Sequence, residues 1–229
     1  FGCARMRNFG LCFFTPDREP RVGHGGVRPI WRCLIVALLG NASVMAHAEP
    51  IRLYAAGSLR AALTDVAKAF EAKTGATVEA TFGPSGTLKD EIAGGAGAHL
   101  FASANMEHPQ ALHDAGKSGP VVRFARNRMC ALATPLLKVD TSNLLKRMLD
   151  PAVKLGTSTP KADPSGDYAF DIFRKADAVK PGARDALEKK ARQLTGGSNA
   201  PTPPAGRLVY GWLVEEGKAD IFLTYCTNA

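Results

Sequence analysis

The chain has 229 residues, 45% of them apolar and 7% aromatic, a profile that indicates one or two compact lobes and excludes a fibrous or disordered protein. Half of its net charge of +8 lies in residues 1–48, where six Arg oppose Asp17 and Glu19. Along the rest of the chain, basic and acidic residues are interleaved, as in residues 185–192, which indicates solvated helix faces. The chain shows no stripe of basic residues with interleaved aromatic residues, which a nucleic-acid-binding groove needs.

The N-terminal region has the pattern of an export signal. Residues 30–48 (IWRCLIVALLGNASVMAHA) place a short apolar run after arginines and end in Ala46-His47-Ala48. This order predicts a secretory signal peptide that is cleaved before Glu49. The apolar run is too short to cross a bilayer, and an uncleaved interfacial helix is the alternative. Residues 1–27 resemble neither a signal nor a domain, so we expect residues 1–48 to lie outside the fold.

Five cysteines are present, and only Cys130 and Cys226 follow the predicted cleavage site. They form no C-x-x-C or Cys/His ligand spacing, so no protein-ligated metal ion is expected. In an oxidising compartment they can form one disulfide. Two buried free thiols are the alternative, and the sequence favours neither.

From residue 51 onward, predicted strands alternate with amphipathic helices. The strands are predicted at 51–56, 76–82, 100–104, 121–124, 128–133, 153–157 and 219–225. The helices are predicted at 59–74, after Gly86, at 144–149, 164–176, 181–194 and 209–217, with a Gly/Pro-rich loop at 195–206. Such alternation predicts an α/β fold with mostly parallel sheets and helices on both faces. Ligands in such folds bind beyond the carboxyl ends of the strands.

The first predicted helix carries a regular apolar stripe. Its members recur at helical spacing, and the stripe is expected to face the core: Leu59, Ala62, Leu63, Val66 and Phe70.

Four predicted helices begin at a small hydroxyl or glycine residue. These starts are Gly57-Ser58, Ser85-Gly86, Ser165-Gly166 and Gly206-Arg207. A helix N-terminus presents unpaired N–H groups and the positive end of the helix dipole, which suits an anion. Any single serine there is more simply an N-cap. The repetition of the pattern favours an anion-binding site.

Several segments in this order resemble the periplasmic molybdate-binding proteins of bacterial ABC transporters. The matching segments are 55–59 (AAGSL), 82–88 (FGPSGTL), 98–105 (AHLFASAN), 163–166 (DPSG) and 213–225 (LVEEGKADIFLTY). The resemblance implies a two-lobed, type II periplasmic-binding-protein-like fold with a first lobe at 49–133 and a second at 134–229. Because members of that family continue back into the first lobe, it also implies that the chain is truncated at its C-terminal end.

The resemblance further implies a set of ligand-binding residues. Ser58 and Ser85 match the family's serine ligands, Tyr225 matches its tyrosine, and Ser165 falls where a backbone amide binds. The remaining amide maps to Gly206 or Arg207, where the arginine side chain adds a cationic contact. Asn105 stands where many members have Asp and is not expected to touch the ligand.

The function implied is capture of molybdate or tungstate in the periplasm for an ABC importer. The expected partners are the oxyanion and the importer's inner-membrane permease, with no cofactor, no nucleic acid and a monomeric protein. A binder of sulfate or of a small organic anion is the alternative.

Two other classes of function are disfavoured. An enzyme is not expected, because neither Ser58 nor Ser85 lies in a G-x-S-x-G elbow and His99, His108 and His113 show no acid–base pairing. An effector domain of a transcription regulator would need a helix-turn-helix before residue 51, where the predicted signal peptide stands.

Overall fold

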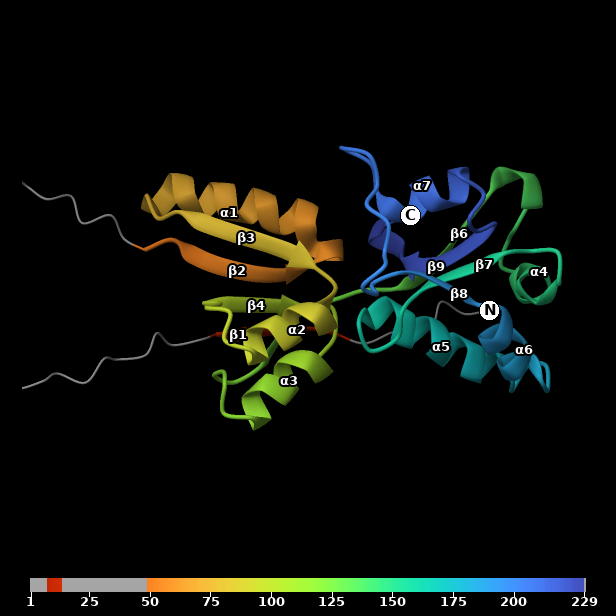
Figure 1. Cartoon of the computed structure of the whole chain (residues 1–229), viewed down its shortest axis with the longest axis horizontal. Coiled ribbons are helices and arrows are strands. Elements are labelled where there is room, and N and C mark those ends of the chain that lie inside the picture. The colour runs from red at the N-terminus through yellow and green to blue at the C-terminus, as the bar shows by residue number, and fades with distance from the viewer. Residues whose placement is uncertain (1–7, 14–48, 229) are drawn as a thin grey trace, which may run out of the picture.

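The computed structural model describes residues 8–13 and 49–228, which form two α/β lobes side by side (Figure 1). The first lobe contains a five-stranded sheet of order β3-β2-β4-β1-β5. Its strands are β1 (Asn8–Phe13), β2 (Ile51–Ala56), β3 (Val78–Gly83), β4 (Leu100–Ser103) and β5 (Val122–Arg126). The second lobe contains a four-stranded sheet of order β6-β9-β7-β8. Its strands are β6 (Met129–Ala133), β7 (Leu155–Ser158), β8 (Arg192–Thr195) and β9 (Ile221–Tyr225).

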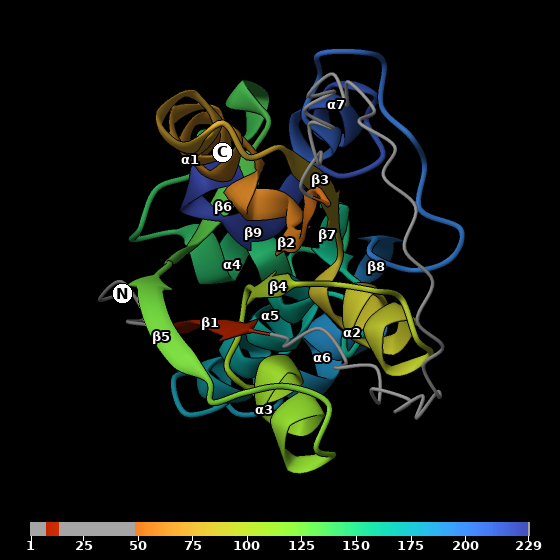
Figure 2. The same ribbon diagram turned by 90° about the vertical axis from the view of Figure 1, so that its left-hand side faces the viewer.

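Helices cover both faces of the sheets. The α-helices are α1 (Arg60–Thr74), α2 (Ser85–Ala93), α3 (Glu107–Asp114), α4 (Leu144–Leu149), α5 (Pro164–Ala176), α6 (Ala183–Lys190) and α7 (Val209–Glu215). The short 3-10 helices are η1 (Gly57–Leu59), η2 (Pro135–Leu137) and η3 (Cys226–Asn228). In the first lobe, α2 and α3 pack on the face that carries Phe101, and α1 lies on the opposite face (Figure 2). No helix within the described residues is long and apolar enough to span a membrane.

The predicted two-lobed α/β fold is confirmed, and both sheets are mixed. Parallel pairs join β2 to β3 and β4, and β7 to β8 and β9. Antiparallel pairs join β1 to β4 and β5, and β6 to β9. The strand–helix alternation therefore predicted the parallel part of each sheet correctly, and the antiparallel strands are additions to it.

The division of the chain between the lobes differs from the prediction. The first lobe was predicted to end at residue 133, which would include β6. In the structure, β6 belongs to the second sheet, so the chain passes from one lobe to the other between β5 and β6. Residues 8–13, expected outside the fold, form β1 inside the first sheet, where Cys12 is fully buried against Ile92 and Phe101. The predicted signal segment at 30–48 lies outside the described residues.

The apolar stripe of the first predicted helix faces the core only at its N-terminal end, where Leu63 is partly buried and packs against the core. No residue of α1 is buried, and Val66 and Phe70 are 60% and 41% exposed. Leu59, in the preceding turn, is buried. The helix itself forms where predicted and ends at Gly75, whose φ of 74° is the left-handed conformation typical of a helix C-terminus.

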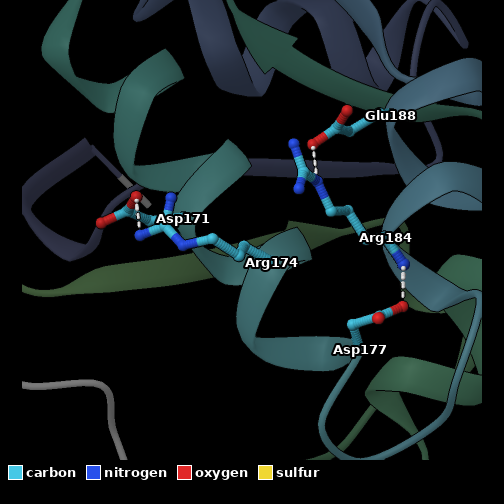
Figure 3. Close-up of polar contacts among 5 residues, drawn as sticks. All are labelled: Asp171, Arg174, Asp177, Arg184 and Glu188. Carbon is cyan, nitrogen blue, oxygen red and sulfur yellow. Dashed lines mark hydrogen bonds and ion pairs between the residues drawn. The ribbon is translucent and has the colours of Figure 1, made fainter.

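The helix predicted at 181–194 is shorter than expected. It ends at Lys190, and Arg192–Thr195 form β8, which pairs in parallel with β7. Most of its charged side chains face solvent, as predicted, but Lys190 is partly buried and donates to the carbonyl oxygens of Met148 and Asp150. Arg184 pairs with Glu188 at 2.8 Å, and its N–H donates to Asp177 at 3.2 Å (Figure 3). On α5, Arg174 pairs in the same way with Asp171. Such exposed pairs contribute little to stability.

A disulfide joins Cys130 in β6 to Cys226, the residue directly after β9, with Cα atoms 4.9 Å apart. Of the two alternatives left open by the sequence, the structure has the bonded one. The bond ties the carboxyl end of β9 to its antiparallel neighbour, at the point where Tyr225 leaves the sheet.

Candidate functional site

A cavity of about 430 Å³ lies between the lobes. The first lobe lines it with residues 56–58, Arg60, residues 82–85 and Ala104. The second lobe lines it with Asp163, Thr195, Gly196, residues 200–203 and 207–210, Tyr225 and Asn228. Most of these residues follow the carboxyl ends of strands, including β2, β3, β4, β8 and β9. This is the place where open α/β sheets bind ligands.

Ser58 lies in η1, immediately after β2. Its Oγ is buried, and it has no hydrogen-bond partner among the described residues. A buried hydroxyl without a partner costs about 1–3 kcal/mol. Because this one lies in the cavity wall, a ligand in the cavity is within its reach.

Ser85 is the first residue of α2 and is 1% exposed. Its Oγ accepts a hydrogen bond from the N–H of Ala104, at the end of β4, at 3.0 Å. A hydroxyl that accepts one bond still has its own proton to donate. The Ala104 contact therefore fixes the Ser85 hydroxyl and leaves it able to act as a donor in the cavity.

Tyr225 ends β9 and is 3% exposed. Its ring packs edge-on against Tyr168, with centroids 6.1 Å apart. Burial, and after it the negative charge of Asp163, raises the pKa of Tyr225 well above its usual value. The Tyr225 hydroxyl is therefore a neutral donor throughout the physiological pH range.

Arg207 also lines the cavity, but its guanidinium forms an ion pair with Glu215. The arginine side chain is 45% exposed and the glutamate 63%. Solvent screening and the partner carboxylate weaken the cationic contact that the sequence suggested here.

The structure does not support Ser165 as an amide donor. Ser165 is fully buried and is not among the residues that line the cavity. Its N–H donates to Asp163 Oδ1 at 3.0 Å, and its Oγ donates to Ser158 Oγ at 2.7 Å. The reason is local: Asp163 is the N-cap of α5 and takes the N–H that the resemblance assigned to the ligand.

The residues of the cavity wall that the sequence did not predict include two charged and two hydroxyl-bearing side chains. Asp163, Thr195 and Tyr210 come from the second lobe, and Arg60 comes from the first, where it lies 4.7 Å above the Phe82 ring. The Asp-Pro pair before a helix was a readable N-cap signal for Asp163. Thr195 had no such signal, because β8 was predicted as the end of a helix.

Comparisons with known proteins agree with this architecture. The sequence profile of the bacterial extracellular solute-binding proteins matches residues 51–229. An uncharacterized protein of Pasteurella multocida is 37% identical over 179 residues, which cover 78% of this chain and 74% of that protein. The molybdate-binding protein ModA of Escherichia coli is 29% identical over 204 residues, which cover 86% and 72%.

Two solved structures share the fold. The periplasmic molybdate-binding protein of Azotobacter vinelandii superposes with a TM-score of 0.60 at 20% identity, covering 76% of this chain and 71% of that one. The sulfate-binding protein SubI of Mycobacterium tuberculosis gives 0.58 at 18% identity, covering 77% and 64%. The match of the family profile to most of the chain, on a two-lobed fold with a cavity between the lobes, shows that this protein belongs to the bacterial extracellular solute-binding proteins.

Proposed function

We propose that the protein captures a small oxyanion, with molybdate or tungstate as first candidates, and delivers it to the permease of an ABC importer. One observation carries the proposal: serine hydroxyls of the first lobe and a tyrosine hydroxyl of the second lobe line the same cavity. These are Ser58, Ser85 and Tyr225, the three side chains that the family resemblance assigned to the ligand.

The chemistry of these groups suits an oxyanion. A dianion such as molybdate carries no proton at neutral pH and can only accept hydrogen bonds. Neutral O–H and N–H donors satisfy it, and they avoid the cost of burying unpaired charged side chains. The Ser58 hydroxyl, buried without a partner in the described structure, is a donor of this kind.

The two-lobed form fits a carrier rather than a catalyst. As a member of the bacterial extracellular solute-binding proteins, the chain is a solute-binding protein and not an enzyme. Closure of two lobes around a hinge removes water from a bound ion and gives the permease a shape that differs from the open form. We place the protein in the periplasm as a monomer, exported by a signal peptide within residues 1–48. Cleavage before Glu49 would also remove β1, so the exported protein would have a first sheet without that strand.

A small organic anion is the second candidate. The cavity volume of about 430 Å³ falls in the range of roughly 300–1,000 Å³ typical of pockets for small organic ligands. Sulfate is a further inorganic candidate, since a sulfate-binding protein has the same fold.

Titration calorimetry with molybdate, tungstate, sulfate and phosphate in turn tests the proposal. We expect heat of binding from at least one of them, and a melting temperature that rises with ligand concentration by linkage. If no oxyanion gives heat and a sugar or amino acid does, the proposal fails.

A further inference from the structure

The cavity wall contains a carboxyl group, which is unexpected in a site for dianions. Asp163 is 9% exposed and is the only acidic residue among the described residues that line the cavity. Asp163 and Tyr225 line the cavity from the second lobe, and Ser58 and Ser85 line it from the first lobe. An ionised carboxylate beside a dianion would repel it, and the repulsion is strong where water is excluded.

The carboxyl group is embedded in a network of hydroxyl groups. Asp163 Oδ1 accepts the Ser165 N–H at 3.0 Å, and the Ser165 and Ser158 hydroxyls lie 2.7 Å apart. Ser158 Oγ in turn lies 2.7 Å from Thr195 Oγ1, another residue of the cavity wall. Hydroxyl groups rotate, so the network can donate to an ionised Asp163 or accept from a neutral one.

Burial raises the pKa of Asp163, and hydrogen bonds from the Ser165 N–H and from the Ser158 and Ser165 hydroxyls oppose that rise. The acidic groups that act with it are Asp167 on α5, Tyr210 on α7 and Tyr225 on β9. The cations of the cavity wall are Arg60 and Arg207, and Arg207 is paired with Glu215. This environment favours the neutral form of the carboxyl group more than water does.

We propose that Asp163 determines the specificity of the site. In the liganded cavity, one proton is shared between the Asp163 carboxyl group and an oxygen of the ligand. A fully deprotonated oxyanion such as molybdate binds to neutral Asp163, which donates the hydrogen bond. The solvent supplies that proton. An oxyanion that carries its own proton, such as hydrogen phosphate, binds to ionised Asp163, which accepts the bond, and no proton is taken up. This inference rests on the proposed function and adds a pH dependence to its ligand preference: above the pKa of Asp163 in the molybdate complex, the site favours proton-bearing oxyanions over molybdate.

The direction of the pH effect follows from linkage. The charge of bound molybdate raises the pKa of Asp163 further than burial alone. Below the pKa of the empty cavity, the affinity for molybdate is constant. Between that value and the pKa in the complex, the affinity falls by about tenfold per pH unit. Hydrogen phosphate should show no such fall, because it keeps its last proton through this range. Its apparent affinity should instead rise with pH at the acid end, where free dihydrogen phosphate must lose one proton to bind in this form.

The test is calorimetry on the whole chain with sodium molybdate and sodium phosphate between pH 5.5 and 8.5, in two buffers of different ionisation enthalpy. Wild type should take up close to one proton with molybdate and lose affinity for it as pH rises. Asp163→Asn keeps an oxygen that can cap α5 and has no charge, so it should bind molybdate without proton uptake, at least as tightly as wild type at pH 8.5. Its affinity for phosphate relative to molybdate should fall at least tenfold.

Asp167 lies on the same helix but interacts electrostatically with Asp163, so Asp167→Asn should itself shift the pH dependence of molybdate binding. The control that should behave as wild type is therefore Asp171→Asn, on the same helix, because Asp171 is paired with Arg174 and does not line the cavity. Molybdate binding that is independent of pH and unchanged in Asp163→Asn would overturn the inference, as would molybdate binding at pH 8.5 without phosphate binding. Failure of the proposed function looks different, since no oxyanion would then give heat at any pH. If Asp163→Asn does not fold, the proton uptake of wild type decides the question.

Discussion

The backbone N–H of Gly86, in the first turn of α2, donates a hydrogen bond to the carbonyl oxygen of Ala162 at 2.9 Å. This bond joins the two lobes directly, next to the cavity residues Ser85 and Asp163. A Cβ at position 86 would lie 2.1 Å from the Lys161 oxygen and 2.7 Å from the Ala162 oxygen. The glycine is therefore needed for close approach of the second lobe, and its N–H is not available to a ligand.

Gly86→Ala should weaken oxyanion binding. Backbone atoms cannot yield as a flexible side chain does, so the lobes must separate or shift, at about the 1–3 kcal/mol typical of overpacking. Calorimetry gives the affinity, and small-angle scattering of the liganded protein shows whether the lobes stay apart. Gly211→Ala in α7 is the matched control, because a Cβ there meets nothing within 4 Å. It should bind normally and gain up to about 1 kcal/mol from helix propensity. Equal affinity in the two variants would contradict the assigned role of Gly86.

Ser58→Ala and Ser85→Ala should each weaken oxyanion binding by about 1–3 kcal/mol, the cost of a lost donor to a charged group. Their effects on the unliganded protein should differ. Ser58 Oγ has no partner within the described structure, so Ser58→Ala should leave the melting temperature unchanged or raise it. Ser85→Ala removes the acceptor of the Ala104 N–H and should lower the melting temperature. Ser142→Ala, on the surface and outside the cavity, is the control. Unchanged affinity in both cavity variants would remove these serines from the site.

Tyr225→Phe should also weaken binding by about 1–3 kcal/mol, because the ring contact with Tyr168 stays and only the hydroxyl is lost. The pKa of Tyr225 is raised, so the hydroxyl remains a neutral donor as pH rises past neutrality. The difference in affinity between wild type and variant should therefore be the same at pH 6 and pH 9. Tyr54→Phe, in the first lobe outside the cavity, should have no effect. A loss that disappears at pH 9 would mean that Tyr225 ionises there.

The parts of the site that the sequence predicted are those fixed by local order. Ser58 and Ser85 directly follow strands that were predicted from their own residues, and Tyr225 ends such a strand. Parallel pairing brings the ends of β2 and β3 to one edge of the first sheet, and Tyr225 ends β9 of the second sheet. The family resemblance implied the role of each side chain, and all three line the same cavity, the serines from the first lobe and the tyrosine from the second.

The parts that were missed depend on contacts distant in sequence. Residues 192–195 continue the apolar spacing of a helix, and only pairing with β7 makes them a strand and places Thr195 in the cavity. Ser165 has the local pattern of an anion-binding helix start, but the carboxylate of Asp163 already occupies its N–H. In α1, the periodicity predicted the helix correctly and the burial of Val66 and Phe70 wrongly, because periodicity says which residues share a face and not what covers that face.

Reduction of the disulfide should destabilise the second lobe and weaken binding. The bond closes a loop between residues 96 apart in sequence, and disulfides typically contribute about 2–4 kcal/mol, more for longer loops. Cys226 directly follows Tyr225. The bond therefore also holds the backbone of Tyr225, whose hydroxyl we propose as a ligand donor, against β6. We expect dithiothreitol to lower the melting temperature of wild type to that of the Cys130→Ala/Cys226→Ala double variant, and to have no further effect on the double variant. Calorimetry of both proteins should show weaker oxyanion binding than in oxidised wild type. If thiol titration shows that both cysteines are reduced and the melting temperature of wild type is unchanged, the bond does not stabilise the protein.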